Sequence, residues 1–344
     1  MQIQENVPLS EHSTMRLGGP ARYLVDITDR FEIAEAVTWA HKHQLPVMMI
    51  GGGSNIIWGD EGFPGLILVN KIMGFDIIHQ DENDLYVSIG AGEHWDTIIG
   101  KTVEMGYSGI EQLSLIPGTV GATPIQNVGA YGREIKDTLT TIEAYDNQLG
   151  KLVTLRNDEC DFGYRMSRFK SNDKGRFFIS SITLHLTKVN PQPPFYPALQ
   201  SYFDEHAIAD ITPQVIRDAV IAIRSAKLPD PAVVANNGSF FFNPVIDKSK
   251  RDELLELYPQ MPNWPVDEDK AKISAAWLLE QSGFKGIHDE QTGMATWEKQ
   301  PLVLVNEHAK STADLLQFKT KIISAVEQKF GITLVQEPEL ISQV

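Results

Sequence analysis

Cysteine is almost absent from this chain of 344 residues, which contains only Cys160. A single cysteine excludes an intramolecular disulfide and any zinc or iron–sulfur site that needs several cysteines. Histidine provides no substitute, because no two histidines are spaced four apart with an acid nearby, and His41 and His43 would face different sides of a helix. The sequence therefore predicts no metal site, and Cys160 is interpreted as a small packed side chain.

Positive charge is also scarce, since 30 basic residues stand against 45 acidic ones and the formal net charge is −15. Nonspecific binding to nucleic acid or to an anionic membrane needs a basic face, so both are disfavoured. A small anionic ligand is still allowed where a few Lys and Arg side chains converge. No apolar run approaches the length of a membrane span, and the first residues lack a signal-peptide pattern, so we expect a cytoplasmic protein without membrane insertion.

The common nucleotide-binding motifs are missing. A G-x-G-x-x-G pattern can be started at Gly51 and Gly53, but its third glycine position is Ile56 and no helical pattern follows. The complete P-loop pattern is missing as well. The five residues Gly51, Gly52, Gly53, Ser54 and Asn55 therefore form either a tight turn or a phosphate-contacting loop of another kind.

The first part of the chain predicts a small α/β unit. Residues 21–27 alternate like a strand, and Asp29 with Glu32 forms a capping box for a helix that runs to about His43. A short buried strand over 46–50 then leads directly into the glycine turn.

The middle of the chain is rich in strand patterns and the last part in helices, with a boundary near residue 205. Four strands are predicted, at 85–89, 141–145, 151–155 and 177–186, with a helix at 97–105. Residues 190–197 are proline-rich and predict a linker or lid. The later elements are a helix from Pro213 to Lys227 capped by Thr212, helices at 249–258 and 274–282, a strand at 302–306, a helix from Ser311 to Gly331 and a strand at 332–335.

The stretch of residues 116–132 is the most informative part of the sequence. It carries no charge, and glycine recurs at Gly118, Gly121, Gly129 and Gly132. Glycine is used where φ is positive or where the backbone must approach something closely. Two prolines and the expected free amides of Thr123, Gln126 and Asn127 suit a diphosphate that lies along the main chain. A surface loop without a ligand is the alternative.

Three polar clusters are candidates for chemistry, and each has a simpler interpretation. Arg165 could bind a carboxylate or phosphate, or could be a surface side chain after a turn. Ser239 follows Gly238 and precedes three phenylalanines, so it is either a hydroxyl at the mouth of an apolar pocket or a turn residue. Lys227 could simply complement a helix end, and Glu337 and Glu339 flank a proline in what could be a solvated tail.

Together, these ordered motifs resemble the UDP-N-acetylenolpyruvoylglucosamine reductase family. The resemblance covers nearly the whole chain, and the proline-rich region after residue 190 is similar to the longer of the family's two forms. The matching motifs are residues 14–20, 51–55, 116–132, 163–165, 227–229, 238–244 and 337–339.

The resemblance implies an α+β fold with an FAD-binding domain of the vanillyl-alcohol-oxidase (PCMH) type, built from two α/β subdomains, and a C-terminal α+β substrate domain. The implied division is residues 1–70 with 330–344, residues 71–205, and residues 206–329. It also implies non-covalent FAD, NADPH as electron donor, a UDP-sugar substrate and a monomer.

The resemblance also assigns roles to individual residues. The implied catalytic residues are Arg165, Ser239 and Glu337. The implied cofactor-binding residues are Gly51, Gly52, Gly53, Ser54, Asn55, Ile116, Pro117, Gly118, Gly121, Ala122, Thr123, Gln126, Asn127, Gly129, Ala130, Tyr131 and Ile179. The implied substrate-binding residues are Tyr164, Tyr202, Arg224, Lys227 and Asn243.

Two features depart from the family pattern. Ala122 stands where a hydroxyl is common in the longer form, so Thr123 would have to supply the missing hydrogen bond to the flavin. The lid tyrosine is offset by one residue from its position in the family pattern, so Tyr202 is the first choice for this role and Tyr196 the second. For the catalytic glutamate, Glu339 is a lesser alternative to Glu337.

The implied reaction is the NADPH-dependent reduction of an enolpyruvyl ether to a lactyl ether during peptidoglycan precursor synthesis. Negative charge would develop next to the substrate carboxylate, where Arg165 and Glu337 would stabilise it, and Ser239 would supply the proton. One rival is an oxidase on the same flavin domain, but residues 116–132 contain no His or Cys that could tether the flavin. A non-catalytic flavin or nucleotide-sugar binding protein is the other rival, and it would not need Arg165, Ser239 and Glu337 together.

Overall fold

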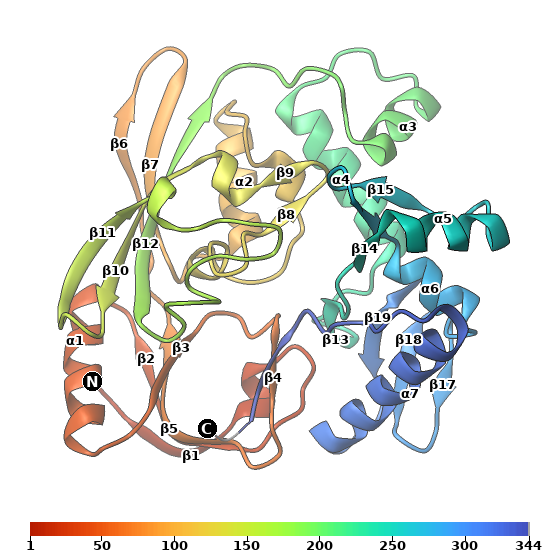
Figure 1. Cartoon of the computed structure of the whole chain (residues 1–344). Helices are drawn as coiled ribbons and strands as arrows, with labels where there is room; N and C mark the ends of the chain where they lie inside the picture. The colour runs from red at the N-terminus through yellow and green to blue at the C-terminus, as the bar shows by residue number, and fades with distance from the viewer. Residues whose placement is uncertain (343–344) are drawn as a thin grey trace. The chain divides into compact units, whose positions relative to one another are not determined.

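The computed structural model describes residues 1–342, and the chain folds as two compact units (Figure 1). The first unit consists of Met1–Val7, Ala21–Gly52 and Pro64–Ala226. The second consists of Pro8–Pro20, Gly53–Phe63 and Lys227–Val344. The predicted division into three domains stays a prediction, and residues 343 and 344 of its 330–344 segment lie outside the described residues.

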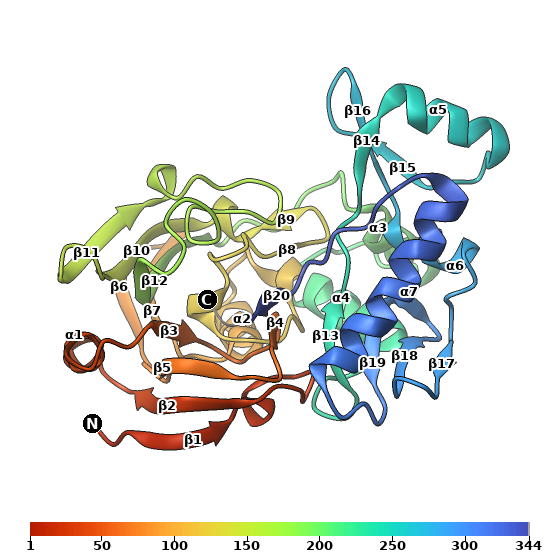
Figure 2. The ribbon, with the colours of Figure 1, turned by 60° about the horizontal axis from the view of Figure 1, so that its bottom comes forward.

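The N-terminal α/β part of the first unit is a four-stranded sheet covered by one helix (Figure 2). Its strand order is β1 (Gln4–Pro8), β2 (Pro20–Ile27), β5 (Phe63–Asn70), β3 (Val47–Ile50), with β3 and β5 parallel. Helix α1 (Arg30–Lys42) begins at the predicted capping box, in which Asp29 accepts from the Phe31 amide and Glu32 accepts from the Asp29 amide. Four of its side chains, Ile33, Ala36, Val37 and Ala40, are buried in the core that α1 shares with the sheet, so the predicted strand–helix–strand unit is confirmed.

A five-stranded antiparallel sheet forms the larger core of the first unit. Its order is β11 (Lys151–Arg156), β10 (Leu139–Asp146), β12 (Phe177–Thr187), β7 (Asp84–Gly90), β6 (Phe75–Gln80). Helix α2 (Trp95–Glu104) packs its buried side chains into the same core. The four predicted strands and the predicted helix are all present.

The run Gly100, Lys101, Thr102 resembles the end of a P-loop pattern, but it lies inside α2 and is not a phosphate-binding loop.

Two further helices of the first unit form a small apolar cluster. Helix α4 (Pro213–Lys227) begins at the predicted cap, where the Val215 amide donates to Thr212 Oγ1 over 3.2 Å. Helix α3 (Pro197–Glu205) was not predicted. Leu199 and Phe203 of α3 are buried against Ile216 and Val220 of α4. The proline-rich segment 190–196 leads into α3, which starts with Pro197 at a position that proline favours.

The second unit is built on a four-stranded sheet and two packed helices. The sheet order is β13 (Ala235–Ser239), β19 (Gln300–Asn306), β18 (Met294–Trp297), β17 (His288–Asp289). Helix α6 (Ala275–Gln281) begins at Ser274, and helix α7 (Thr312–Phe330) begins at Ser311 and ends at Gly331 in the left-handed conformation. The predicted start of α7 at Ser311 and its end at Gly331 are confirmed, and the inner faces of α6 and α7 share one apolar core.

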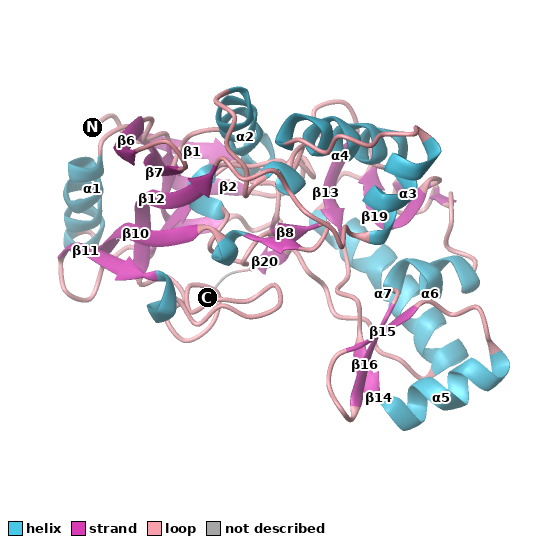
Figure 3. Ribbon diagram, turned by 90° about the horizontal axis from the view of Figure 1, so that it is seen from above, coloured by secondary structure: helices cyan, strands magenta, loops and turns pink. Residues whose placement is uncertain are grey.

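Two smaller strand groups complete the second unit. Strands β14 (Val245–Asp247), β16 (Lys270–Ile273) and β15 (Asn263–Pro265) form a sheet beside α5 (Lys248–Leu257), as Figure 3 shows. Strand β20 (Glu339–Ile341) pairs in parallel with β4 (Ile56–Trp58).

The predicted final strand at 332–335 is wrong, because the last strand of the described chain is β20. Ile332 and Leu334 are buried in the core next to α7, and this burial explains the alternating pattern that suggested a strand. Pairing begins only at the end of the segment, where the Val335 carbonyl accepts from the Phe242 amide over 2.9 Å and Gln336 forms an isolated antiparallel bridge with Phe241.

Candidate functional site

The two glycine-rich segments pack directly against each other in the first unit. A Cβ on Gly51 would lie 2.1 Å from Thr119 Oγ1, and a Cβ on Gly52 would lie 3.2 Å from the Gly118 Cα. The distance at Gly51 leaves no space for a side chain, and the distance at Gly52 is a tight contact that would force the neighbouring backbone to shift by a few tenths of an ångström. The expectation that glycine marks a close backbone approach is therefore confirmed, and the approaching group at these positions is the other glycine segment.

The rest of the 51–55 turn belongs to the second unit, where it meets the N-terminal segment and β13. Gly53 has φ +64°, and a Cβ there would lie 2.1 Å from the His12 carbonyl oxygen. Ser54 and Asn55 are half-buried, and the Asn55 carbonyl accepts from the Glu339 amide over 2.9 Å. The C-terminal segment therefore lies next to the first glycine turn, as the family resemblance implies.

Within the 116–132 stretch, two glycines are required by packing inside the protein. A Cβ on Gly121 would lie 2.5 Å from the Ala91 Cβ, and a Cβ on Gly129 would lie 2.9 Å from the Glu134 Cγ. Gly118 has φ +121°. The other predicted cofactor residues of the stretch are half-buried: Ile116, Pro117, Ala122, Gln126, Ala130 and Tyr131.

The expectation that Thr123 and Asn127 offer free amides is wrong. The Thr123 amide donates to the Val120 carbonyl (3.1 Å) and the Asn127 amide to the Pro124 carbonyl (3.3 Å), because both residues lie in tight turns. The Thr123 hydroxyl also donates to the Val120 carbonyl over 2.8 Å. The Thr123 hydroxyl proton is therefore already used in a hydrogen bond within the protein. Thr123 is a poor replacement for the hydroxyl that Ala122 lacks, which was expected to donate a hydrogen bond to the flavin.

Asn127 is fully buried and ties the glycine stretch to the loop of Arg165. Its Nδ2 donates to Glu134 Oε2 and to the Gly163 carbonyl, each over 2.9 Å. Its Oδ1 accepts from the Lys136 amide over 3.3 Å. The side chain thus holds two loops of the first unit together.

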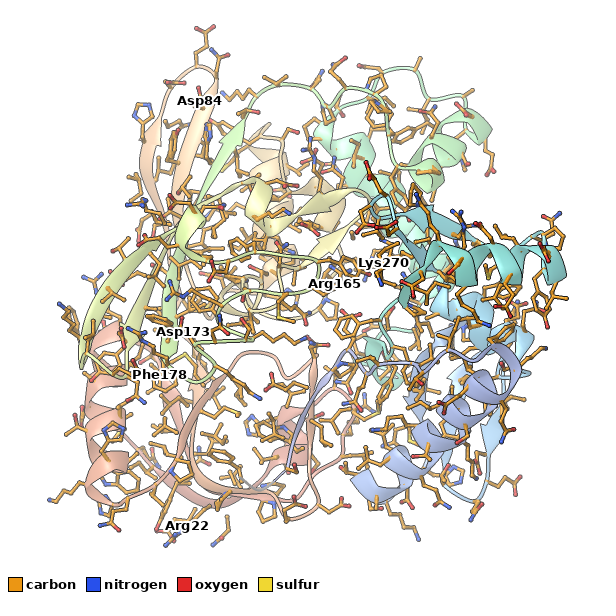
Figure 4. All side chains as sticks on the ribbon, viewed as in Figure 1. Arg22, Asp84, Arg165, Asp173, Phe178 and Lys270 are labelled. Carbon is orange, nitrogen blue, oxygen red and sulfur yellow. The ribbon has the colours of Figure 1, made fainter. Side chains whose placement is uncertain are left out.

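Arg165 lies in the loop between β11 and β12, where Figure 4 labels it. Its backbone has φ +53°, and its Nη2 donates to the Gly129 carbonyl over 2.7 Å. The guanidinium lies 5.7 Å from the ring of Tyr164, a half-exposed side chain. The carbonyl of Gly129 orients the guanidinium beside the glycine stretch, so this arginine is not a loose surface side chain.

Arg224, on α4, is the second cation of this region. It makes a side-chain hydrogen bond with Tyr131 and is close enough to Arg165 to feel its charge. Burial lowers the pKa of Arg224 and raises the pKa of the Tyr131 hydroxyl. Two guanidiniums and a phenol therefore converge within the first unit, an arrangement that favours an anionic ligand.

The two candidate lid tyrosines lie in different surroundings. Tyr196 packs edge-on against Tyr131, with ring centroids 5.7 Å apart. Tyr202, the first choice from the sequence, stacks instead on His206 at 4.1 Å. The structure thus brings Tyr196, the second choice, to the glycine stretch.

Ser239 and the segment of Glu337 lie side by side in the second unit. Ser239 is exposed at the end of β13, after Gly238 with φ +69°. The next residue, Phe240, is buried, and its carbonyl accepts from the Glu337 amide over 2.9 Å. Glu337 is half-buried, and the interpretation of 337–339 as a solvated tail is wrong, because this segment is hydrogen-bonded into the unit.

The remaining predicted residues have identifiable places. Lys227 is exposed at the end of α4, and the Asn243 side chain accepts from the Ala275 amide at the start of α6. Ile179 is buried in the core of the five-stranded sheet. Cys160 is fully buried, and burial raises the pKa of its thiol to about 12, so it is an unreactive packed side chain as expected.

One structural residue of the site was missed by sequence reasoning. The Asn237 amide is buried and donates to Thr14 Oγ1 and to the carbonyls of Ser54 and Ile56, over 3.1–3.3 Å. It thereby joins the strand of Ser239 to the first glycine turn. The local pattern Asn-Asn-Gly indicates only a turn, so no signal in the sequence identified this link.

Comparisons with known proteins agree with these features. Residues 21–156 match the model of an FAD binding domain, and residues 230–341 match the C-terminal domain of UDP-N-acetylenolpyruvoylglucosamine reductase. The reductase of Ralstonia nicotianae is 40% identical over 343 residues, covering 98% of this chain and 99% of its own length. That of Alcanivorax borkumensis is 42% identical over 296 residues, covering 86% and 84%.

The chain belongs to the UDP-N-acetylenolpyruvoylglucosamine reductase family.

Its fold agrees with that of a solved family member. The reductase of Thermus caldophilus superimposes with a TM-score of 0.69 at 21% identity, over 99% of this chain and all of the other. The predicted fold class, an FAD-binding domain with a C-terminal α+β domain, is thereby confirmed, and so is FAD as the cofactor of this oxidoreductase family.

The residues around the glycine segments fit an FAD molecule. Buried polar atoms without a hydrogen-bond partner in the described structure include Thr119 Oγ1, Arg224 Nε and Asn237 Oδ1. All three belong to or adjoin the motifs that predicted cofactor and substrate binding.

Among the described residues there is no cluster of His, Cys, Asp and Glu suited to a metal ion, and no helix long and apolar enough to cross a membrane.

Proposed function

We propose that this chain reduces UDP-N-acetylglucosamine enolpyruvate to UDP-N-acetylmuramate with electrons from NADPH, in peptidoglycan precursor synthesis. Family membership supports the reaction. The observation that supports it most is the hydrogen bond between the Phe240 carbonyl and the Glu337 amide, because it joins the segment of Glu337 to the residue that follows Ser239. Two of the three expected catalytic residues therefore lie on neighbouring segments. A non-catalytic binding protein has no need of that arrangement.

Bound FAD would carry the electron pair from NADPH to the alkene of the substrate. In this proposal, the two glycine segments hold it through the main chain of residues 51–55 and 116–131. Asn127 acts indirectly, since its side chain is committed to Glu134 and Gly163. Ile179, which the resemblance places near the flavin ring, is buried in the core of the five-stranded sheet, so in this proposal it supports the cofactor site from within the core.

Arg165 binds the substrate carboxylate and stabilises the negative charge that develops beside it. A guanidinium is always charged and offers a planar fork of donors. The Gly129 carbonyl holds one edge of this fork, so the guanidinium is oriented before substrate arrives. Arg224 adds a second positive charge and, with Lys227, favours the anionic UDP-sugar over neutral sugars.

Ser239 donates the proton that completes the reduction. A hydroxyl is a weak acid, but a carbanion next to a carboxylate is a strong base, and a positioned donor is sufficient. Glu337 supports this step from the neighbouring segment. Asn243, Tyr164 and a lid tyrosine contact the substrate in this proposal, and the contact of Tyr196 with Tyr131 favours Tyr196 over Tyr202 in the lid role.

The proposal also includes a monomeric, cytoplasmic enzyme without a nucleic-acid partner. The net charge of −15 supports the last point, because a nucleic-acid-binding surface needs excess positive charge.

The test is the product and its stoichiometry. The chain, with FAD, is incubated with NADPH and the enolpyruvyl substrate under exclusion of oxygen. We expect one NADPH consumed per substrate and a product heavier by two hydrogen atoms, as mass spectrometry would measure. NADPH oxidation that occurs only with oxygen, without a reduced product, would contradict the proposal and favour an oxidase.

A further inference from the structure

Thr119 carries a buried hydroxyl that the protein leaves without a partner. Its Oγ1 is shielded from solvent, and no donor or acceptor among the described residues bonds it. Native proteins nearly always pair such atoms, since an unpaired buried hydroxyl destabilises the fold. An unpaired hydroxyl inside a cofactor-binding segment therefore indicates a ligand atom.

The position of this hydroxyl is fixed by its surroundings. The Thr119 carbonyl accepts from the Ala122 amide over 3.0 Å, and the neighbouring Val120 amide donates to the Glu93 carbonyl over 2.9 Å. Oγ1 lies 2.1 Å from the point that a Cβ on Gly51 would occupy, and the Ala122 Cβ lies 3.5 Å from the same point. The hydroxyl thus lies where the two glycine segments meet.

The neighbouring hydroxyl cannot take this role. Thr123 Oγ1 donates to the Val120 carbonyl over 2.8 Å, and Ala122 has no hydroxyl. Thr119 is therefore the residue of this turn whose hydroxyl proton is not assigned to the protein.

We propose that Thr119 Oγ1 donates a hydrogen bond to an anionic oxygen of the FAD diphosphate. The inference deepens the proposed function and depends on its assignment of the two glycine segments to FAD. Uncharged segments rich in glycine allow a phosphate to approach the main chain closely. A hydroxyl donor there adds a directed bond to a charged acceptor, which is stronger than a bond between neutral groups.

The test compares Thr119→Val, which keeps the shape of the side chain, with Thr119→Ser, which keeps the hydroxyl. FAD affinity of the full chain is measured by quenching of flavin fluorescence. We expect Thr119→Val to weaken FAD binding about 10- to 100-fold, the loss expected for one hydrogen bond to a charged group. Thr119→Ser should bind FAD with an affinity within about threefold of that of the wild-type protein.

Melting temperature without FAD provides the second measurement, with Thr140→Val as the matched control. The Thr140 hydroxyl donates to the Thr183 carbonyl over 3.0 Å, so its removal should lower the melting temperature and leave FAD affinity unchanged. Thr119→Val should leave the melting temperature unchanged or raise it, because it removes an unpaired polar group.

Three results would overturn the inference. Unchanged FAD affinity in Thr119→Val would show that the hydroxyl does not bind FAD, while the proposed function would stand. A melting temperature lowered as in Thr140→Val would show that the hydroxyl bonds the protein or a buried water. If the wild-type protein bound no FAD, both the inference and the proposed function would fail.

Discussion

At the scale of single residues, the chemistry depends on groups whose surroundings differ sharply. Ser239 is exposed, while Phe240 and Phe241, which follow it, are buried. Arg165 is oriented by a backbone carbonyl, and Cys160 is fully buried. These surroundings, more than residue type alone, separate a reactive side chain from an inert one.

Replacing Ser239 by Ala should block proton delivery without affecting electron entry. We expect turnover of the enolpyruvyl substrate to fall about 10²- to 10⁴-fold, the usual contribution of a positioned proton donor. The rate of flavin bleaching by NADPH alone should stay within about twofold, since that step uses no proton from Ser239. Rapid-mixing absorbance measures the two half-reactions separately.

The exposed Ser324 of α7 supplies a matched Ser→Ala control that should change neither half-reaction. An equal loss in both half-reactions for Ser239→Ala would indicate a damaged fold, and unchanged substrate turnover would exclude Ser239 as the proton donor.

Cys160 gives a prediction about pH. Burial raises the pKa of its thiol from 9.0 to about 12. Above pH 9 the unfolded chain therefore loses a proton that the folded chain keeps, so folding stability declines as pH rises. At pH 10 the decline from this one group is about 1 kcal/mol. Cys160→Ala should remove this part of the alkaline decline, as urea unfolding at pH 8 and pH 10 would measure.

A Cys160→Ala protein with the same alkaline decline as the unchanged chain would contradict that account. Thiol reagents provide an independent check, because the folded protein should react with them only as fast as it unfolds.

At the scale of elements, the fold follows local signals where those signals are strong. Helices α1 and α7 begin at the capping residues that the sequence indicates, and Gly331 ends α7 in the left-handed conformation. The strands of the five-stranded sheet follow their apolar patterns. Local patterns failed for α3, which has no side-chain cap, and for 332–335, where buried residues alternate without a partner strand.

The site was less predictable than the fold, for a physical reason. Periodicity describes one element at a time, whereas Ser239 and Glu337 are 98 positions apart and lie on segments joined by backbone hydrogen bonds at Phe240 and Phe242. Arg165, Gly129 and Arg224 are likewise far apart in the sequence and close together in the fold. Only the ordered set of motifs, through its family resemblance, connected these residues. The glycines were interpreted correctly as places of close approach, but the structure shows that other parts of the protein approach several of them.

The contact between the glycine segments can be tested by a double replacement. Gly51→Ala should destabilise the chain without FAD by about 1–3 kcal/mol, because its Cβ would clash with the Thr119 side chain. Combining it with Thr119→Ala should recover part of this loss, since residues in contact do not act additively. Urea unfolding of the two single variants and the double variant gives the coupling.

If the changes in the free energy of unfolding caused by Gly51→Ala and Thr119→Ala simply added in the double variant, direct packing of Gly51 on Thr119 would be contradicted. Gly175→Ala is a useful comparison, because Gly175 has positive φ and no neighbour within 4 Å. Its cost should come from backbone strain alone and should be unaffected by Thr119→Ala.

At the scale of the whole molecule, the candidate site residues are distributed over two discontinuous units. Arg165, Arg224 and Tyr131 belong to the first, and Ser239 and Glu337 to the second. The turn at 51–55 contributes residues to both. Because the net charge is −15, the proposed binding of an anionic substrate depends on a few positive side chains, such as Arg165 and Arg224, and not on the charge of the whole chain.

The central claim is that the chain transfers electrons from NADPH to the enolpyruvyl substrate through FAD. Its most direct test is the visible absorbance of the FAD-loaded protein without oxygen, first with NADPH and then with substrate. UDP-N-acetylglucosamine, which lacks the enolpyruvyl group, is the control addition. We predict that NADPH bleaches the flavin absorbance, that the control leaves it bleached, and that the enolpyruvyl substrate restores it. Absorbance that returns only when oxygen is admitted would contradict the account.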